Sequence, residues 1–126
     1  MAQVILRVNA GFSLVSAVVL VFFGSSIKGW FGLGSAKALI VIGLFLGAFA
    51  WSLLRTANQP VIPAKDLRSF AVADLTWVVA SAILLLVANV PPAGTLVLVL
   101  VSLIVAVLGV AQWRAAGQIP EPGATL

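Results

Sequence analysis

The chain has 126 residues, of which 63% are hydrophobic and 8% are charged, with a mean hydropathy of +1.25 and a formal net charge of +4. Soluble domains are about 45–50% apolar and about 25% charged, so this composition excludes a water-soluble domain and indicates a membrane protein. The chain has no cysteine and no histidine. Disulfides, thiol catalysis and the commonest metal ligand and general base are therefore excluded.

Two charge-free apolar runs in the first half of the chain each have the length of a membrane span. A helix crosses the hydrocarbon core in about 20 residues, with a range of about 17–25. We therefore expect a first helix at about residues 4–23 and a second at about residues 35–54. The segment between them holds Trp30 and Phe31, which suits a position at the membrane–water interface.

The second half contains one longer apolar run, residues 69–113, in which Asp74 is the single charged residue. This run is too long for one span, so we expect two helices, at about residues 69–90 and 95–113. The Pro-Pro-Ala-Gly sequence at 91–94 predicts a tight turn between them, because proline lacks an amide hydrogen and glycine relaxes the backbone.

The predicted fold class is all-α, a polytopic membrane protein built as an antiparallel bundle of four transmembrane helices. The segments lack the apolar/polar alternation that the strands of a membrane barrel require. Residues 1–117 would form one four-helix transmembrane domain, and residues 118–126 a disordered cytoplasmic tail.

A weak internal repeat raises the alternative that the bundle is a duplicated helical hairpin. Residues 9–17 and 74–82 share the order polar, aromatic, Ser, Ala, and Gly-x-x-x-Trp occurs at both 47–51 and 109–113. A duplication would relate the two halves by a pseudo-two-fold axis along the membrane normal. Apolar sequences also match one another by chance, so both alternatives stay open.

The cationic residues predict an orientation. One side of the predicted membrane carries Arg7, Arg55, Lys65, Arg68 and Arg114, and the other carries Lys28 and Lys37. By the positive-inside rule we expect both termini in the cytoplasm, in a bacterial cytoplasmic (inner) membrane. The same distribution accounts for the sequence pI of about 10.9, so the expected partner is the lipid bilayer and not nucleic acid.

Three polar residues are expected at similar depth near the cytoplasmic ends of their helices. Asn9 opens the first helix, Asp74 lies about one turn into the third, and Gln112 closes the fourth. The helices run antiparallel, so these side chains would form one buried cluster. Ser13 shares the face of Asn9, and Ser81 shares the face of Asp74, which adds both to the candidate site.

Asp74 has two interpretations. An acid at the centre of a membrane helix costs about 2.5–3.5 kcal/mol, so such residues often bind an ion, a proton or a ligand. In that case Arg55 would also belong to the candidate ligand- or ion-binding residues, and Trp77 could be the wall of an apolar pocket rather than an interfacial anchor. Alternatively, Asp74 accepts hydrogen bonds from the two amides, or pairs with Arg7 or Arg55, to lock the helices in register.

Small residues predict close helix packing. Gly43 and Gly47 form a Gly-x-x-x-Gly motif in the second helix, and Gly109 lies on the polar face of the fourth. Such motifs allow two helix backbones to approach each other. The contact could lie within the bundle, or between copies in a homo-oligomer or a larger membrane complex. The chain has three acidic residues in total, so neither a metal site nor a cofactor is expected.

Residues 9–13 (Asn-Ala-Gly-Phe-Ser), 73–78 (Ala-Asp-Leu-Thr-Trp-Val) and 112–114 (Gln-Trp-Arg) resemble the small, functionally uncharacterised four-helix integral membrane proteins of bacteria. The resemblance spans most of the chain and implies no activity. Small multidrug transporters carry their essential acid in the first helix, where this chain has Asn9. Fluoride channels carry a glycine-rich motif ending in arginine in that helix, which this chain lacks.

We therefore expect an accessory, structural or interaction protein of the membrane, with a buried polar cluster around Asp74. The alternative is a small transporter or channel that uses Asp74 to bind a proton, a cation or a small ligand. An enzyme is not expected, because the chain offers no nucleophile–base pair. A single carboxylate acting on a lipid is the one catalytic role left.

Overall fold

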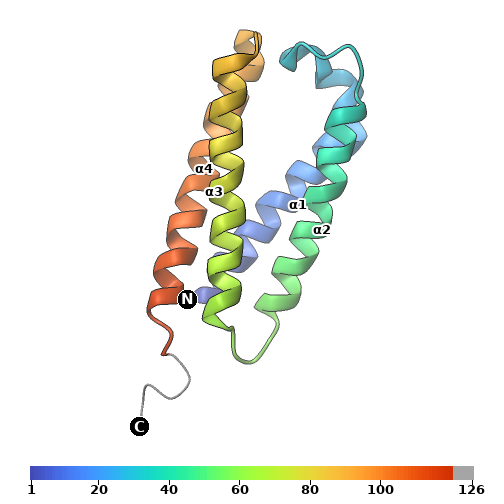
Figure 1. Cartoon of the computed structure of the whole chain (residues 1–126). Helices are drawn as coiled ribbons and strands as arrows, with labels where there is room; N and C mark the ends of the chain where they lie inside the picture. The colour runs from blue at the N-terminus through green and yellow to red at the C-terminus, as the bar shows by residue number, and fades with distance from the viewer. Residues whose placement is uncertain (121–126) are drawn as a thin grey trace.

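The computed structural model describes residues 1–120, and four long helices account for most of them (Figure 1). The helices are α1 at Ala2–Ile27, α2 at Lys37–Ala57, α3 at Ala64–Val87 and α4 at Pro92–Gly117, with a short 3-10 helix, η1, at Lys28–Phe31. All four long helices are long and apolar enough to span a membrane, which confirms the predicted all-α fold. By helix length and hydropathy, the chain is a multi-pass membrane protein.

The helices differ from their predicted ranges mainly at the ends. α1 and α4 each extend beyond both predicted ends, α2 is shifted toward the C-terminus, and α3 is shifted toward the N-terminus. α3 begins at Ala64, ahead of the predicted residue 69, because the extended backbone of Pro63 (φ −66°, ψ 137°) leads directly into a helical turn that contains Asp66. An acid is favourable in the first turn of a helix, and long charged side chains can reach water from a helix end.

Consecutive helices pack as two hairpins, α1 with α2 and α3 with α4. The main helix contact between the hairpins joins α1 to α4, and Figure 1 shows α1 running obliquely so that its first turns lie beside α4. Met1 and Ile119 line the same small pocket, so the N-terminus and the end of α4 share one end of the bundle. We call this the terminal end, and the other the opposite end.

The hydrophobic core lies at the terminal end. Its buried residues are Leu6, Ala10, Leu53, Ala57, Ile62, Leu67, Ala115 and Ala116, contributed by all four helices and the α2–α3 connection. Phe49 and Phe70 add an edge-to-face contact between α2 and α3, with ring centroids 5.7 Å apart. Ile119 also packs against this core. Of the predicted disordered tail, residues 121–126 lie outside the described residues.

The two hairpins also contact each other at the opposite end. Gly94, in the first turn of α4, lies so close to η1 that a Cβ atom there would collide with the backbone oxygen of Trp30. Gly32, which caps η1 in the left-handed conformation (φ 72°), lies against Pro91. These glycines allow η1 to contact the α3–α4 turn at backbone distance.

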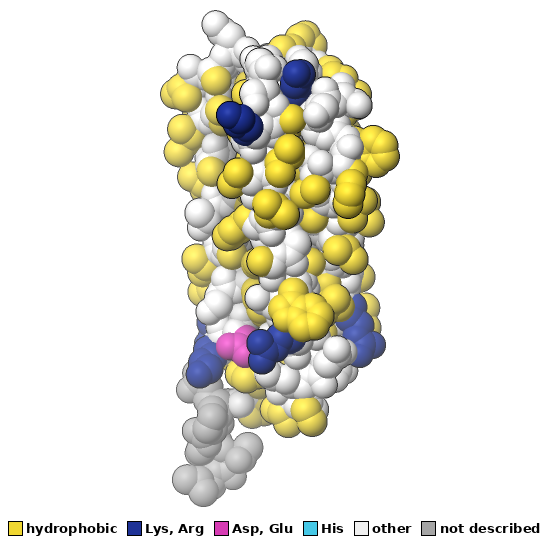
Figure 2. Space-filling view, turned by 90° about the vertical axis from the view of Figure 1, so that its right-hand side faces the viewer, with side chains coloured by type: hydrophobic (Ala, Val, Ile, Leu, Met, Phe, Trp, Pro, Cys, Tyr) yellow, Lys and Arg dark blue, Asp and Glu magenta, His cyan; other side chains and the backbone are white. Residues whose placement is uncertain are grey.

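The surface has the charge distribution of a membrane-spanning bundle. Figure 2 shows the lysine and arginine side chains of one face in two bands, one at each end of the molecule, with hydrophobic and uncharged groups between them. Large apolar side chains such as Val41, Phe45 and Val107 are more than 60% exposed. Lipid chains are the solvent that such a surface requires.

Candidate functional site: a buried polar cluster

Asn9 of α1, Asp74 of α3 and Gln112 of α4 form a closed triangle of hydrogen bonds, which confirms the predicted cluster. Asn9 Nδ2 donates to Asp74 Oδ2 at 2.8 Å and to Gln112 Oε1 at 2.7 Å. Gln112 Nε2 donates to Asp74 Oδ2 at 2.7 Å. Asp74 Oδ2 therefore accepts two bonds, and both N–H groups of the Asn9 amide are used.

The cluster is buried and its polar atoms are largely paired with one another. The exposed fractions are 1% for Asn9, 5% for Asp74 and 0% for Gln112. Ser13, one turn along α1, extends the cluster by donating from its hydroxyl to Asn9 Oδ1 at 3.4 Å. Buried polar groups without partners are costly, so this mutual pairing is what makes the cluster tolerable inside an apolar bundle.

Gly109 allows α3 and α4 to approach each other at the cluster. A Cβ atom at Gly109 would lie 3.2 Å from Leu75 Cγ and 3.4 Å from Asp74 Cβ. Gln112 lies one turn further along the same face of α4, so the short helix separation brings its amide to Asp74. Gly109 thus lies at a close contact between the two helices of one hairpin.

Gly43 packs closely within the other hairpin. A Cβ atom there would lie 2.8 Å from Val21 Cγ2 and 3.1 Å from the Ala17 backbone oxygen. At Gly47 it would meet only Ala17 Cβ, at an ordinary 3.9 Å. In the sequence repeat, Gly47 corresponds to Gly109, yet the two glycines face non-equivalent turns of their partner helices. These contacts give the repeat no support, and the duplicated hairpin stays a prediction from the sequence.

An apolar layer separates the cluster from the terminal end. Leu6 precedes Asn9 by one turn of α1, and Ala71 precedes Asp74 by one turn of α3. On α4, Ala115 and Ala116 follow Gln112 by one turn and belong to the same hydrophobic core as Leu6. Leu6 and Ala71 are both fully buried. The cluster is thus covered, on the side nearest the chain termini, by closely packed side chains.

The remaining candidate residues occupy different environments. Ser81 is 5% exposed on the face of α3 that carries Asp74. Trp77 is partly buried, and its Nε1 atom has no hydrogen-bond partner among residues 1–120. Arg55 is exposed, and Arg7 donates to Asn58 Oδ1 at 3.4 Å. The hydrogen bonds to Asp74 come from amides, so the alternative of an arginine partner is not observed.

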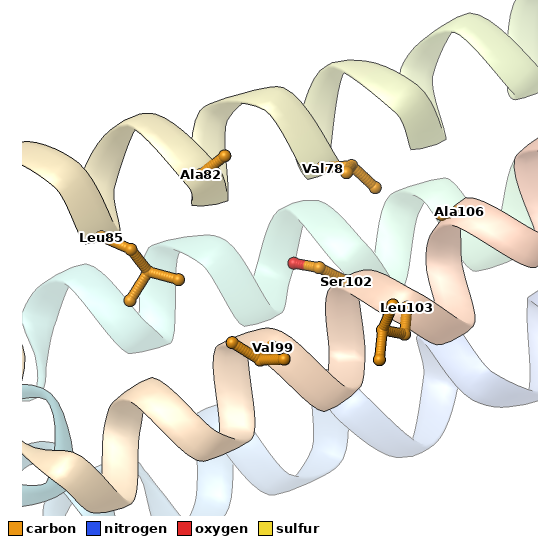
Figure 3. Close-up of a pocket in the computed structure, with 7 residues that line it drawn as sticks. All are labelled: Val78, Ala82, Leu85, Val99, Ser102, Leu103 and Ala106. Carbon is orange, nitrogen blue, oxygen red and sulfur yellow. The ribbon is translucent and has the colours of Figure 1, made fainter.

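A feature that the sequence analysis missed lies on the outer side of the α3–α4 hairpin. The Arg68 guanidinium carbon lies 5.8 Å from the ring centroid of Trp113. Further along the same two helices is a hollow of about 220 Å³, shown in Figure 3. The sequence contained a pattern that could have indicated this shared face of α4. Val99, Ala106 and Trp113 are spaced by two helical turns and therefore lie on one side of the helix.

No protein family, curated protein or solved structure matches this chain. The resemblance to four-helix membrane proteins of bacteria therefore stays a prediction at the level of a family. The structure supports a more general description: a small four-span membrane protein in which buried Asp74 is hydrogen-bonded to Asn9 and Gln112.

Proposed function

We propose that the protein is an accessory or structural membrane protein in which the Asn9–Asp74–Gln112 cluster holds two helical hairpins in register. One observation carries this proposal. The single amide of Asn9, in the first hairpin, donates to both helices of the second hairpin. The hairpins also meet in the hydrophobic core at the terminal end and at η1, and the close approach of their long helices lies mainly between α1 and α4.

The energetic role of such a cluster is specificity rather than large stabilisation. A hydrogen bond between membrane helices contributes about 0.6 kcal/mol on average and up to about 1–2 kcal/mol. A misaligned pair of hairpins would lose these bonds and leave a carboxyl and two amides facing hydrocarbon. The cluster therefore penalises every other register.

The proposal places the protein in a bacterial cytoplasmic membrane with both termini in the cytoplasm, as the positive-inside rule favours. It assigns no catalytic role to the chain. A small protein with a rigid four-helix core could serve as a subunit of a homo-oligomer or of a larger membrane complex, with exposed apolar side chains of all four helices available to a partner.

A second candidate function is transport, in which Asp74 binds a proton or a cation. The observation that favours it is a series of buried polar atoms beyond the cluster. Trp77 Nε1 and Ser102 Oγ are buried with no hydrogen-bond partner among residues 1–120. The apolar layer on the terminal side of the cluster favours the structural role, because it blocks the shortest path from water to Asp74.

Purified protein in liposomes distinguishes the two functions. We expect proton and cation flux at the background of empty liposomes for the parent protein and for Asp74→Asn, which removes the charge and keeps the side-chain shape. The exposed Asn89→Ala variant serves as the matched control. Flux in the parent that disappears in Asp74→Asn, with an unchanged melting temperature, would overturn the structural role and identify Asp74 as the coupling residue.

A further inference from the structure

We infer that the outer side of the α3–α4 hairpin binds one anionic phospholipid, with its phosphate at Arg68 and one acyl chain in the groove beside Ser102. The inference is independent of the role proposed for the Asn9–Asp74–Gln112 cluster. It rests on a groove lined by α3 and α4, on a cation that contacts an aromatic ring nearer the terminal end of the same two helices, and on the alignment of the cation and the groove along those helices.

The groove is apolar and opens away from the first hairpin. It is lined by Val78, Ala82 and Leu85 of α3 and by Val99, Ser102, Leu103 and Ala106 of α4. In Figure 3 these side chains lie on the near side of α3 and α4, and α1 and α2 lie behind them. The hollow exists because the side chains of Ala82 and Ala106 are too small to fill it. At this depth of the membrane, the molecules available to fill it are hydrocarbon chains.

The cation is held at the terminal end of the same hairpin. Arg68 is partly buried, with its guanidinium 5.8 Å from the ring centroid of Trp113, and Trp113 is 50% exposed. Stacking on an aromatic ring orients a guanidinium without neutralising its charge. Tryptophan is typical of the membrane–water interface, which is the depth of a phospholipid phosphate.

The charges around Arg68 favour an anion. Lys65 lies one turn before Arg68 on α3, and Arg114 follows Trp113 on α4, and both side chains are exposed. Within residues 1–120, the acidic residues are Asp66 and Asp74, both in α3, and Asp74 is buried in the cluster with Asn9 and Gln112. The acidic residue near Arg68 in sequence is Asp66. It lies two positions from Arg68, which places it on the opposite side of the helix. A guanidinium with free N–H groups can then bind two phosphate oxygens at once.

Helical spacing aligns the cation with the groove. Arg68, Leu75 and Ala82 are spaced by two turns along α3, and Val99, Ala106 and Trp113 are spaced by two turns along α4. Both series therefore lie on the outer side of the hairpin. The lining residue of α3 nearest to Arg68 is Val78, which lies roughly 15 Å away along the axis at about 1.5 Å per residue, close to the thickness of one leaflet, about half of the roughly 30 Å hydrocarbon core. One acyl chain can follow this path from a headgroup at Arg68.

The test is native mass spectrometry of the full-length protein in detergent, titrated with dioleoyl phosphatidylglycerol or with dioleoyl phosphatidylcholine. The two lipids share their acyl chains and differ in charge. We expect the first phosphatidylglycerol to bind at least about fivefold more tightly than phosphatidylcholine, the factor that one cation near a charged headgroup supplies. Equal affinity for the two lipids would overturn the inference.

Two pairs of variants test the two halves of the site. Arg68→Gln is expected to weaken phosphatidylglycerol binding roughly fivefold, whereas Arg55→Gln, at the same end but on α2, leaves it unchanged. Ala82→Leu fills the groove and is expected to weaken the binding of both phosphatidylglycerol and phosphatidylcholine. Ala80→Leu, an exposed change two residues away, serves as its control. Equal losses in Arg68→Gln and Arg55→Gln would indicate a diffuse cationic surface and overturn the site, as would unchanged binding in Ala82→Leu.

Two further measurements separate the site from simpler explanations. Inorganic phosphate, added as a competitor at the lipid concentration, is expected to displace no lipid, and full displacement would indicate an anion site without a lipid chain. If Arg68→Gln has a lowered melting temperature, Arg68→Lys is used in its place. Lysine keeps the charge and loses the paired N–H geometry, so the preference for phosphatidylglycerol should fall but persist. An unchanged preference would overturn the role of the guanidinium.

Discussion

Asn9 Nδ2 and Asp74 Oδ2 are joined by a 2.8 Å hydrogen bond although the residues are 65 positions apart and belong to different hairpins. The second N–H of the same amide bonds Gln112 at 2.7 Å. One side chain of α1 thus contacts both helices of the α3–α4 hairpin. An apolar bundle has little hydrophobic driving force between its helices in lipid, so we propose that this connection selects one arrangement of its two halves.

Asn9→Leu is expected to destabilise the protein by about 1–3 kcal/mol, because it removes two donors and leaves Gln112 Oε1 and one lone pair of Asp74 Oδ2 unpaired in a buried site. Thermal unfolding in a mild detergent measures the effect. Asn89→Leu, in the exposed α3–α4 turn, is the matched control and should have the same melting temperature as the parent protein. Equal melting temperatures for Asn9→Leu and the parent would contradict a structural cluster.

Asp74→Asn is expected to change stability by less than about 1 kcal/mol. An asparagine carbonyl can accept the two hydrogen bonds that Asp74 Oδ2 accepts from Asn9 and Gln112. Asp74→Leu removes this acceptor and should cost about 1–3 kcal/mol under the same conditions. The order of the two melting temperatures is the measurement, and a less stable Asn variant would show that the charge itself is needed.

Gly43→Ala is expected to destabilise the α1–α2 hairpin by about 1–3 kcal/mol through overpacking. The new methyl group would lie 2.8 Å from Val21 Cγ2 and 3.0 Å from Leu20 Cβ. Gly11→Ala is the control, since no described atom outside its own helix lies within 4 Å of a Cβ there. That variant should be neutral or stabilised by up to about 1 kcal/mol, because alanine favours the helix. Similar melting temperatures for the two variants would contradict the close contact.

The orientation predicts different labelling of two lysines in intact cells. Lys65 lies at the terminal end and should be protected from an amine reagent that does not cross the membrane, whereas Lys28, at the opposite end, should be labelled. Peptide mapping of the purified protein identifies the modified residue, and labelling after cell lysis shows that both lysines can react. Labelling of Lys65 before lysis would reverse the proposed topology.

Sequence alone determined the number of membrane-spanning helices and the positions of the polar residues along them. Backbone groups in lipid must be hydrogen-bonded within their own helix, so a charge-free apolar run of sufficient length specifies a span without reference to the rest of the fold. Positions along antiparallel spans then give depth, which is why Asn9, Asp74 and Gln112 could be expected together. The helix ends were less predictable, because charged turns such as the one around Asp66 add residues beyond the apolar run.

Tertiary structure alone decided how each helix is rotated and which side chains meet. These helices are apolar around most of their circumference, so hydropathy does not distinguish a buried face from a lipid-facing one. The contact of Arg68 with Trp113 and the groove beside Ala82 depend on the rotation of α3 and α4. That rotation is set by close packing at Gly109 and by the hydrogen bonds to Asp74, because in lipid van der Waals contact and polar pairing replace the hydrophobic effect as the forces between helices.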